Sequence, residues 1–205
     1  MPVPETDSTV VDVAFDVRGT SLPADYALPL LLAIEAQLPW LPGEALAGIH
    51  PLRALPTAYG VVLLAQRAKL VLRLPEARLP DALALQHASL DIGGSALLVG
   101  AGSARELRPS ATLSAQRVAT DAVDEAAFEA DVADTLRRLG VAARLISGGR
   151  RRANAGGREI AGFALALHDL GPADSLRIQR TGVGGERRLG WGVFVPAKTI
   201  YAADE

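Results

Sequence analysis

This 205-residue chain has three histidines, and His50 is the one best placed for chemistry. It stands in AGIHPLR, where Pro51 fixes the direction of the chain and Arg53 follows two residues beyond that proline on an expected extended strand. An imidazole can take or give a proton near neutral pH, and a neighbouring guanidinium can stabilise charge that develops on a phosphate. The segment predicts proton transfer at a phosphate; the alternative is a structural or surface histidine.

The other histidines are weaker candidates. His87 closes an apolar helical run, and His168 follows the strand-like segment FALAL. The three histidines lie far apart without an HxH or HExxH pair, and the chain has no cysteine, so we expect neither a metal site nor a cofactor. The acids of DAVDEAAFEADVAD fall on several faces of one expected helix, which indicates solvent-facing charge and not the paired carboxylates of a two-metal nuclease.

A glycine-rich segment, GVGGERRLGWG, precedes the last expected strand and has the pattern G-h-G-x5-G-h-G, where h is apolar. Glycine allows close approach to a phosphate chain and positive φ, and two arginines in the middle supply charge. A mononucleotide loop is disfavoured because the chain has no GxGxxG after a strand and no GxxxxGK[ST], whereas a plain flexible turn stays open. The candidate residues are Gly182, Gly184, Gly185, Arg187, Arg188, Gly190 and Gly192.

The net charge of −2 hides a basic C-terminal region. From residue 136 to residue 200 there are twelve Arg or Lys residues and four acids, so this stretch carries +8. Eleven of the twelve are arginine, which suits phosphate contact and stacking on exposed bases. Arg150, Arg151 and Arg152 should lie at a projecting β-hairpin, in GGRRR, while Arg108 and Lys198, the latter in the final strand, are weaker phosphate candidates. The alternative is a solvated basic surface.

The first half of the chain alternates strands and helices. Residues 9–18 have the period-two pattern of a half-buried strand, and residues 27–38 follow as a helix with Pro29 in its first turn. Three short extended segments, a short helix and a hairpin-like end come next; they are residues 48–55, 60–66, 69–75, 79–88 and 89–102.

The second half repeats this order. A strand at 110–120 precedes a helix from Asp124 to Leu139, with Asp124 as its cap and Gly140 as its end. A strand pair around a basic glycine turn, a helix starting at Pro172 and a last strand at 189–198 follow. The sequence therefore predicts an α+β protein with two tandem β-α-β-β-α-β, ferredoxin-like modules, RRM-like in architecture, at 1–105 and 106–205.

A G-h-G-x5-G-h-G segment before the C-terminal strand of a double ferredoxin-like chain resembles the repeat-associated (RAMP) superfamily of CRISPR proteins, over essentially the whole chain. Within that superfamily, GIHPLR, GGRRR and the ending RRLGWGVFVPAK look like the repeat-cleaving endoribonucleases, the sixth family of CRISPR-associated proteins. The glycine segment marks the superfamily well and the cleaving family less well, because non-cleaving relatives share it. Many relatives carry the catalytic histidine at the end of the first helix, so it maps onto His50 approximately.

The resemblance implies metal-independent cleavage of CRISPR repeat RNA by its own 2′-hydroxyl, with His50 as general base or acid, Arg53 as a stabiliser of the phosphorane, and Tyr26 or another hydroxyl assisting. The partners it implies are the repeat or guide RNA stem-loop and other subunits of a CRISPR effector complex. Two alternatives stay open: a non-catalytic RNA-binding subunit of the same superfamily, and a ferredoxin-like protein that binds a small anionic ligand.

The composition also bears on location. Apolar residues make up 49% of the chain and charged residues 21%, which is ordinary for a globular protein, and no apolar run is long enough to cross a bilayer. The first ten residues, MPVPETDSTV, are acidic and polar and lack the basic and apolar regions of a secretory signal. We expect a cytoplasmic protein without a membrane partner.

Overall fold

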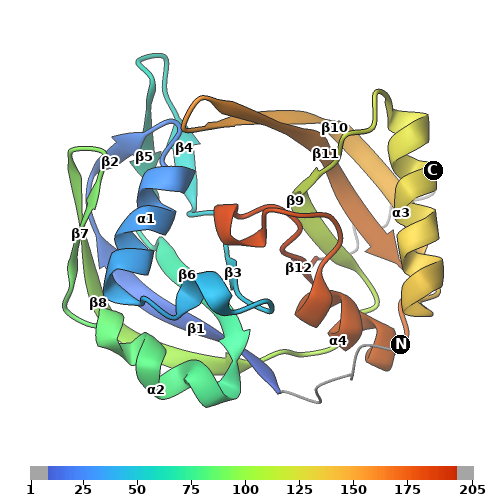
Figure 1. The fold of residues 1–205 in the computed structure, drawn as a ribbon, viewed down its shortest axis with the longest axis horizontal. Helices are drawn as coiled ribbons and strands as arrows, with labels where there is room; N and C mark the ends of the chain where they lie inside the picture. The colour runs from blue at the N-terminus through green and yellow to red at the C-terminus, as the bar shows by residue number, and fades with distance from the viewer. Residues whose placement is uncertain (1–8, 198–205) are drawn as a thin grey trace, which may run out of the picture. The chain divides into compact units, whose positions relative to one another are not determined.

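A computed structural model of the protein describes residues 9–197 (Figure 1). The chain divides into two compact units, Met1–Leu107 and Arg108–Glu205, and each is described by itself. Both units combine an antiparallel sheet with helices, which is the α+β class that the sequence predicts. Within residues 9–197, no helix is both long enough and apolar enough to span a membrane.

The first unit is built on a sheet with the order β3-β6-β1-β8-β7, in which all neighbours are antiparallel. In the β-α-β-β-α-β sequence, β3, β6, β1 and β8 are the second, third, first and fourth strands, so this is the ferredoxin-like order, with β7 added as a hairpin partner of β8. The strands are β1 (Val10–Arg18), β3 (Gly48–Ile49), β6 (Lys69–Pro75), β7 (Ser89–Ile92) and β8 (Ser95–Glu106).

The alternation read in the first strand is real: Val13 and Phe15 are fully buried, while Asp16 is exposed. Helix α1 (Ala27–Gln37) follows, buries Leu30 and Ile34, and packs beside β7. The second crossover consists of short helical turns, η2 (Glu76–Arg78), α2 (Leu79–Ala82) and η3 (Leu83–Leu85), and a further turn, η1 (Leu41–Gly43), follows α1. A small separate sheet has the order β2-β5-β4, made of Ser21–Pro23, Val61–Leu64 and Ala54–Pro56.

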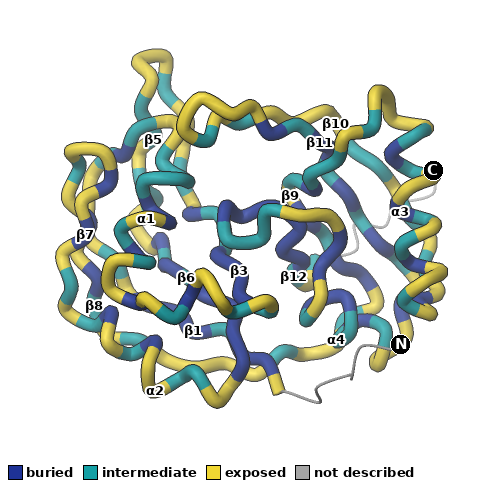
Figure 2. The backbone as a smooth tube through the Cα atoms, viewed as in Figure 1, coloured by how far each residue is buried: buried dark blue, intermediate teal, exposed yellow. Residues whose placement is uncertain are grey.

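The second unit has the same strand order, β10-β11-β9-β12. Its strands are β9 (Leu113–Ala119), β10 (Arg144–Ala155), β11 (Arg158–His168) and β12 (Val195–Pro196), and its helices are α3 (Glu125–Leu139) and α4 (Pro172–Thr181). Figure 2 shows the central strands β1 and β6 of the first unit largely buried, whereas the tips of the β4–β5 and β10–β11 hairpins are exposed.

The helix signals read from the sequence of the second unit act as expected. The side chain of Asp124 accepts a hydrogen bond from the N–H of Ala127 at 2.9 Å, and Gly140 ends α3 in the left-handed conformation. Phe128 and Phe163, from α3 and β11, stack with ring centroids 5.0 Å apart in the core. The core of this unit therefore joins α3 to the sheet.

Three local predictions were wrong. The β10–β11 turn is at Gly156 and Gly157, both with positive φ, and GGRRR lies inside β10 at a β-bulge between Ser147 and Arg150. The last strand contains only Val195–Pro196, because the preceding residues pack as irregular buried backbone. The segment 48–55 is not one strand: β3 joins the five-stranded sheet and β4 joins the small sheet.

Candidate functional site

His50 lies immediately after β3 and is held at two points. Its backbone N–H donates to the carbonyl of Val71 at 2.9 Å, which continues the pairing of β3 with β6. Its ring atom Nε2 lies 3.2 Å from Oδ1 of Asp12, on β1. The side chain is 13% exposed, so the imidazole is largely enclosed yet still reachable from solvent.

Asp12 in turn is held by Arg73 of β6. The guanidinium donates from Nε to Oδ1 at 2.7 Å and from Nη2 to Oδ2 at 2.9 Å, a two-point contact that fixes the plane of the carboxylate. Arg73 is completely buried, and the side chain of Asp12 is 20% exposed. Burial acts to raise the pKa of Asp12, but hydrogen bonds from His50 and Arg73 outweigh it and hold this pKa far below its ordinary value.

The sheet register explains why these three side chains meet. Asp12 pairs directly with Arg73 across β1 and β6, and Gly48 pairs with Arg73 on the other side. His50 is two residues beyond Gly48, so strand alternation places it on the same face as Asp12 and Arg73. The sequence reasoning did not single out Asp12 or Arg73; the available signal was that each stands between apolar neighbours inside a central strand.

Tyr26, the residue before α1, is bound to the loop that follows His50. Its hydroxyl accepts a hydrogen bond from the N–H of Leu52 at 3.1 Å and lies 3.5 Å from the carbonyl oxygen of the same residue. Leu52 is buried and stands between Pro51 and Arg53. The contact of Tyr26 seen here is therefore with the backbone two residues beyond His50.

Arg53 does not lie on a strand with His50. The chain leaves the five-stranded sheet at His50, and Arg53 precedes β4 of the small sheet, where its carbonyl accepts from the N–H of Ala65 at 2.9 Å. The Arg53 side chain is exposed. The expectation of a shared strand face fails because the chain changes sheets at Pro51, so the structure supplies no strand geometry that brings Arg53 to His50.

The other two histidines have different surroundings. His87 is exposed and has a positive φ of 66°, in the turn before β7. Nδ1 of His168, at the end of β11, lies 3.3 Å from the hydroxyl of buried Thr112. Among the residues that the structure describes, neither has a carboxylate contact like that of His50. In the part of the chain that the structure describes, no group of three or more His, Asp or Glu is arranged to hold a metal ion.

The three consecutive arginines of β10, Arg150 to Arg152, alternate between the two faces of the sheet. Arg150 donates to the carbonyl of Val123 at 3.1 Å and lies 5.7 Å from the centroid of the Phe163 ring, on the side of the sheet that α3 covers. Arg152 pairs with Glu159 at 3.7 Å. Arg151, on the opposite face, is exposed and contacts the carbonyl of Arg150, and no described carboxylate lies within ion-pair distance of it. Of these three arginines, Arg151 therefore has the charge most available to a phosphate.

The two weaker candidates for phosphate binding are Arg108 and Lys198. Arg108 begins the second unit and has an exposed side chain, while its carbonyl accepts a hydrogen bond from Nε2 of buried Gln179 at 2.9 Å. Its backbone is therefore fixed on α4, and its charge faces solvent. Lys198 lies outside the described residues.

The glycine-rich segment runs from the end of α4 to β12, and its glycines serve its own packing. A Cβ on Gly182 would lie 2.4 Å from the carbonyl oxygen of Gly192, and one on Gly192 would lie 2.3 Å from that of Val183. Gly184 would meet the carbonyl oxygen of Ala119, in β9, at 2.7 Å. All three glycines have positive φ. The sequence predicts that these glycines let the backbone approach a phosphate chain. In the structure, these three glycines instead let one stretch of backbone pack closely against another.

Two charged residues of the segment, Arg187 and Glu186, already make contacts within the protein. The Nε and Nη2 atoms of Arg187 are buried, and its side chain packs against Gly182. Glu186 has a positive φ of 63° and binds Arg158 of β11 at 2.9 Å. Arg188 is half-buried, and Gly185 is exposed. The outer surface of the segment is therefore formed by Gly184 and Gly185, which are exposed, and by parts of Glu186, Arg187 and Arg188.

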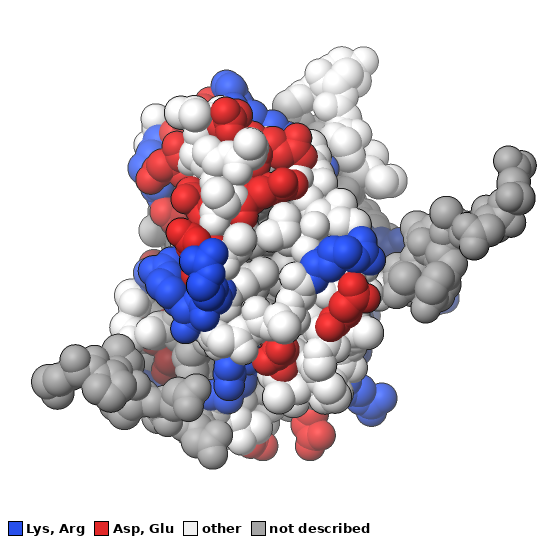
Figure 3. Space-filling model, turned by 90° about the vertical axis from the view of Figure 1, so that its right-hand side faces the viewer, with Lys and Arg blue, Asp and Glu red and all other residues white. Residues whose placement is uncertain are grey.

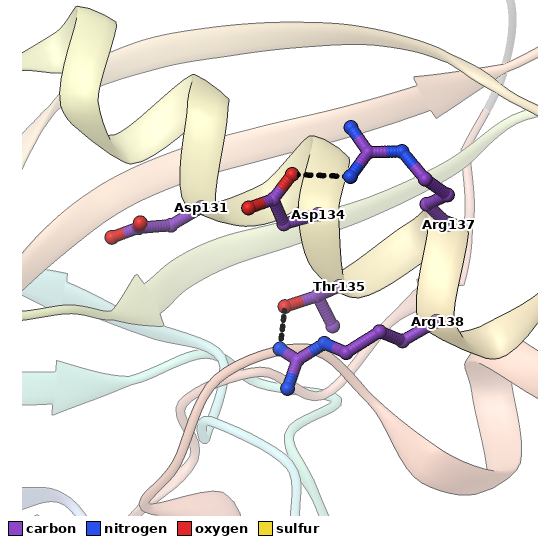
Figure 4. A pocket seen from close by; sticks show the side chains of 5 residues that line it. All are labelled: Asp131, Asp134, Thr135, Arg137 and Arg138. Atoms are coloured by element: carbon purple, nitrogen blue, oxygen red, sulfur yellow. Dashed lines mark hydrogen bonds and ion pairs between the residues drawn. The ribbon is translucent and has the colours of Figure 1, made fainter.

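The outer face of α3, unlike the basic segments described above, carries many acidic side chains (Figure 3). Figure 3 shows acidic side chains gathered over one part of this face, with a group of basic side chains beside them. A shallow pocket of about 450 Å³ lies on the helix, lined by Asp131, Asp134, Thr135, Arg137 and Arg138. In Figure 4 its polar groups pair internally, Arg137 with Asp134 at 2.6 Å and Arg138 with Thr135 at 3.0 Å. This pocket contains none of the candidate residues that the sequence indicates.

Two ferredoxin-like units in tandem, with a glycine-rich segment before the last strand, define the RAMP class of proteins. The match to a family profile is more specific: the Cas6 profile, described as "Cas6 Crispr", matches residues 11–199. The chain belongs to the Cas6 family. A curated relative, the CRISPR-associated endonuclease Cas6 of Myxococcus xanthus (strain DK1622), is 38% identical over 187 residues, which are 91% of this chain and 81% of that protein.

Solved structures agree with the fold. The structure named CRISPR associated protein Cas6 has a TM-score of 0.63 at 10% identity and covers 94% of this chain and 100% of that one. A structure titled "An RAMP protein binding different RNA substrates" has a TM-score of 0.62 at 12% identity, over 93% and 100% of the two chains. At such low identity these matches establish the architecture, and they confirm the double ferredoxin-like prediction.

Proposed function

We propose that this protein cuts CRISPR repeat RNA into guide RNA without a metal ion, by attack of a 2′-hydroxyl on the adjacent phosphate. Family membership and the 38% identical endonuclease support the reaction class. The observation that carries the proposal is His50, an imidazole 13% exposed and held by an ionised carboxylate. Of the three histidines it is the one that strand pairing and a charged partner both orient.

The reaction needs two proton transfers. The 2′-oxygen forms a bond to phosphorus as its proton leaves, and the bond between phosphorus and the 5′-oxygen breaks as that oxygen gains a proton. The products are a 2′,3′-cyclic phosphate and a 5′-hydroxyl. His50 serves one of these transfers, as base or as acid. Arg53, exposed three residues later, is available to a phosphate, and Tyr26 supports the loop between them through Leu52.

RNA binding is assigned to the second unit. Arg151 offers an exposed charge from β10, and the exposed Gly184 and Gly185 lie with the half-buried Arg188 on the outer surface of the glycine-rich segment. A backbone without side chains at the first two positions leaves room for a phosphate chain. The acidic part of the α3 face would repel RNA, so it is an unsuitable surface for the same ligand.

The proposal also covers the fate of the cleaved RNA and the partners of the protein. The processed guide stays bound, and the protein joins other subunits of a CRISPR effector complex. We place the activity in the cytoplasm, in keeping with a composition that is ordinary for a globular protein. The competing function within the superfamily is a subunit that holds guide RNA and does not cut it.

The test is cleavage of a labelled repeat RNA in EDTA by the wild-type protein, His50→Ala and a control, His87→Ala. We expect the wild type and the control to cut at one site and leave a cyclic phosphate, and His50→Ala to bind RNA without cutting. His87 is a suitable control because it is exposed and lies in a turn of the same unit. Binding without cutting by all three proteins would instead identify a guide-holding subunit.

A further inference from the structure

Asp12, Arg73 and His50 form a linked series of side chains on one face of the first sheet. Arg73 contacts both carboxylate oxygens of Asp12, at 2.7 and 2.9 Å, and Oδ1 of the same carboxylate lies 3.2 Å from Nε2 of His50. Arg73 is fully buried, so the carboxylate is anchored from the interior. A carboxylate with both oxygens bound by one guanidinium cannot rotate without losing a hydrogen bond, and its position relative to the imidazole is therefore fixed.

The protonation of Asp12 decides which nitrogen of His50 is left for chemistry. An ionised carboxylate can only accept hydrogen bonds, so Nε2 of His50 must carry the hydrogen in this contact. When the ring is neutral it carries only one N–H. The lone pair then resides on Nδ1, and a proton gained or lost by the ring passes through that atom. This follows from the geometry because Asp12 stays ionised with Arg73 beside it.

We propose that Asp12, anchored by Arg73, is a positioning residue for His50: it fixes the Nε2–H tautomer and thereby makes Nδ1 the ring atom that exchanges the proton. This inference rests on the proposed ribonuclease function and adds the residue and the ring nitrogen through which it operates. A carboxylate on the far nitrogen of a catalytic imidazole is a known way to orient the ring and to stabilise its charged form. Asp12 itself need not touch the RNA.

Three other charged residues on or near this face are Asp16, Lys69 and Arg53. Asp16 and Lys69 lie on the same face by strand alternation and form their own ion pair. Arg53, on the loop after His50, has an exposed side chain. The carboxylate of Asp12 is thus the acidic group in hydrogen-bond contact with the imidazole, and Asp16→Asn is a matched control, since it removes the same charge from the same strand and face.

The tautomer can be measured in the unaltered protein. Two-bond proton–nitrogen correlation spectra of ¹⁵N-labelled protein, with His50 assigned from its loss in His50→Ala, report both ring nitrogens. Above the pH at which His50 loses its proton, we expect Nε2 to give the shift of a protonated nitrogen and Nδ1 that of an unprotonated one. An Nδ1–H pattern, or an average of the two tautomers, would overturn the proposal.

The kinetic test compares Asp12→Asn with Asp16→Asn in single-turnover cleavage across pH. We expect Asp12→Asn to bind RNA as the wild type does and to cut about 100-fold more slowly. Its rate profile should also move to lower pH where it reports His50, because an amide no longer favours the charged ring. Asp16→Asn should keep the wild-type rate and profile. Thermal unfolding of each variant shows whether it is folded at the assay temperature.

The outcomes separate the two proposals. If the wild type does not cut, the ribonuclease function fails, whatever the spectra show. If the wild type cuts, His50→Ala does not, and a folded Asp12→Asn retains the wild-type rate and pH profile, the function stands and the positioning role of Asp12 is wrong. A slower Asp12→Asn with an unmoved pH profile would also count against it, because a purely structural effect lowers the rate without moving the profile.

Discussion

Asp12 and Arg73 lie directly opposite each other on β1 and β6, and they join through two hydrogen bonds of 2.7 and 2.9 Å. Because the arginine is fully buried, the pair is part of the interior of the first unit as well as the support of His50. We therefore expect both stability and the proposed cleavage to be sensitive to this contact.

Removal of Arg73 should destabilise the first unit strongly. Arg73→Met keeps most of the side-chain volume but leaves the carboxylate of Asp12 without its main partner, and loss of one member of a buried pair costs about 3 to 5 kcal/mol. Urea unfolding measures the change. Lys69→Met, on the same strand, removes a more exposed ion pair and should cost less than about 1 kcal/mol. Equal effects of the two substitutions would contradict the buried role of Arg73.

The contribution of Asp12 to stability should depend on pH in one direction. Burial raises its pKa, but the hydrogen bonds from His50 and Arg73 outweigh that effect and place the pKa well below the ordinary 3.8. A depressed carboxyl pKa stabilises the folded state above pH 3.8, and this stabilisation is lost as the pH falls below that value. The difference in unfolding free energy between wild type and Asp12→Asn should therefore be largest near neutral pH and shrink in acid.

Tyr26→Phe tests the support of the loop after His50. It removes the hydroxyl that accepts the hydrogen bond of the Leu52 N–H, at a cost of about 1 kcal/mol. We expect slower cleavage with unchanged RNA affinity, because the loop carries His50 and Arg53 and the second unit is untouched. Tyr59→Phe is the control, since Tyr59 is 89% exposed. A fall in RNA affinity without a fall in cleavage rate would argue for a binding role instead.

Arg151→Ala should weaken RNA binding more than Arg152→Ala. Arg151 faces away from α3 without a described acidic partner, whereas Arg152 is paired with Glu159. One lost phosphate contact lowers the slope of log affinity against log salt by about 0.7 to 0.9. Fluorescence anisotropy over a salt series supplies the slope. An unchanged slope in Arg151→Ala would place the RNA elsewhere.

Gly192→Ala should destabilise the second unit, whereas Gly185→Ala should not. A Cβ at Gly192 would lie 2.3 Å from the carbonyl oxygen of Val183, at a φ of +62°, while nothing lies within 4 Å of a Cβ at Gly185. Strain at positive φ alone costs about 1 kcal/mol, and the overlap with backbone adds to it. Thermal unfolding distinguishes the two variants, and a stable Gly192→Ala would mean that the segment repacks.

Sequence patterns predict the parts of this fold that depend on local periodicity. The alternation of β1, the cap at Asp124 and the glycine end of α3 are all local, and each has its expected place. The short extent of β12 and the change of sheets at Pro51 depend on packing against distant segments, so no local pattern could supply them. The change of sheets is also why the expectation that Arg53 shares a strand with His50 was wrong.

The candidate site was predictable only in part. The sequence singles out His50 by its neighbours, but the contact with Asp12 spans 38 residues and the Arg73 contact with Asp12 spans 61. Such contacts depend on strand register, which a single sequence specifies weakly unless the pairing partner is known. Charged residues at Asp12 and Arg73, each between apolar neighbours, were the visible sign that a polar contact was needed there.

The packing of Gly182 against the carbonyl of Gly192, and of Gly192 against the carbonyl of Val183, sets a limit on how this protein can be redesigned. In both cases an added Cβ would meet a backbone oxygen, so its enlargement cannot be offset by trimming a neighbouring side chain. Sequence variety that alters which RNA is preferred must therefore enter elsewhere in the segment. Gly185, with open space around its Cβ position and an exposed backbone, is the place where a new side chain can be added at little cost to folding.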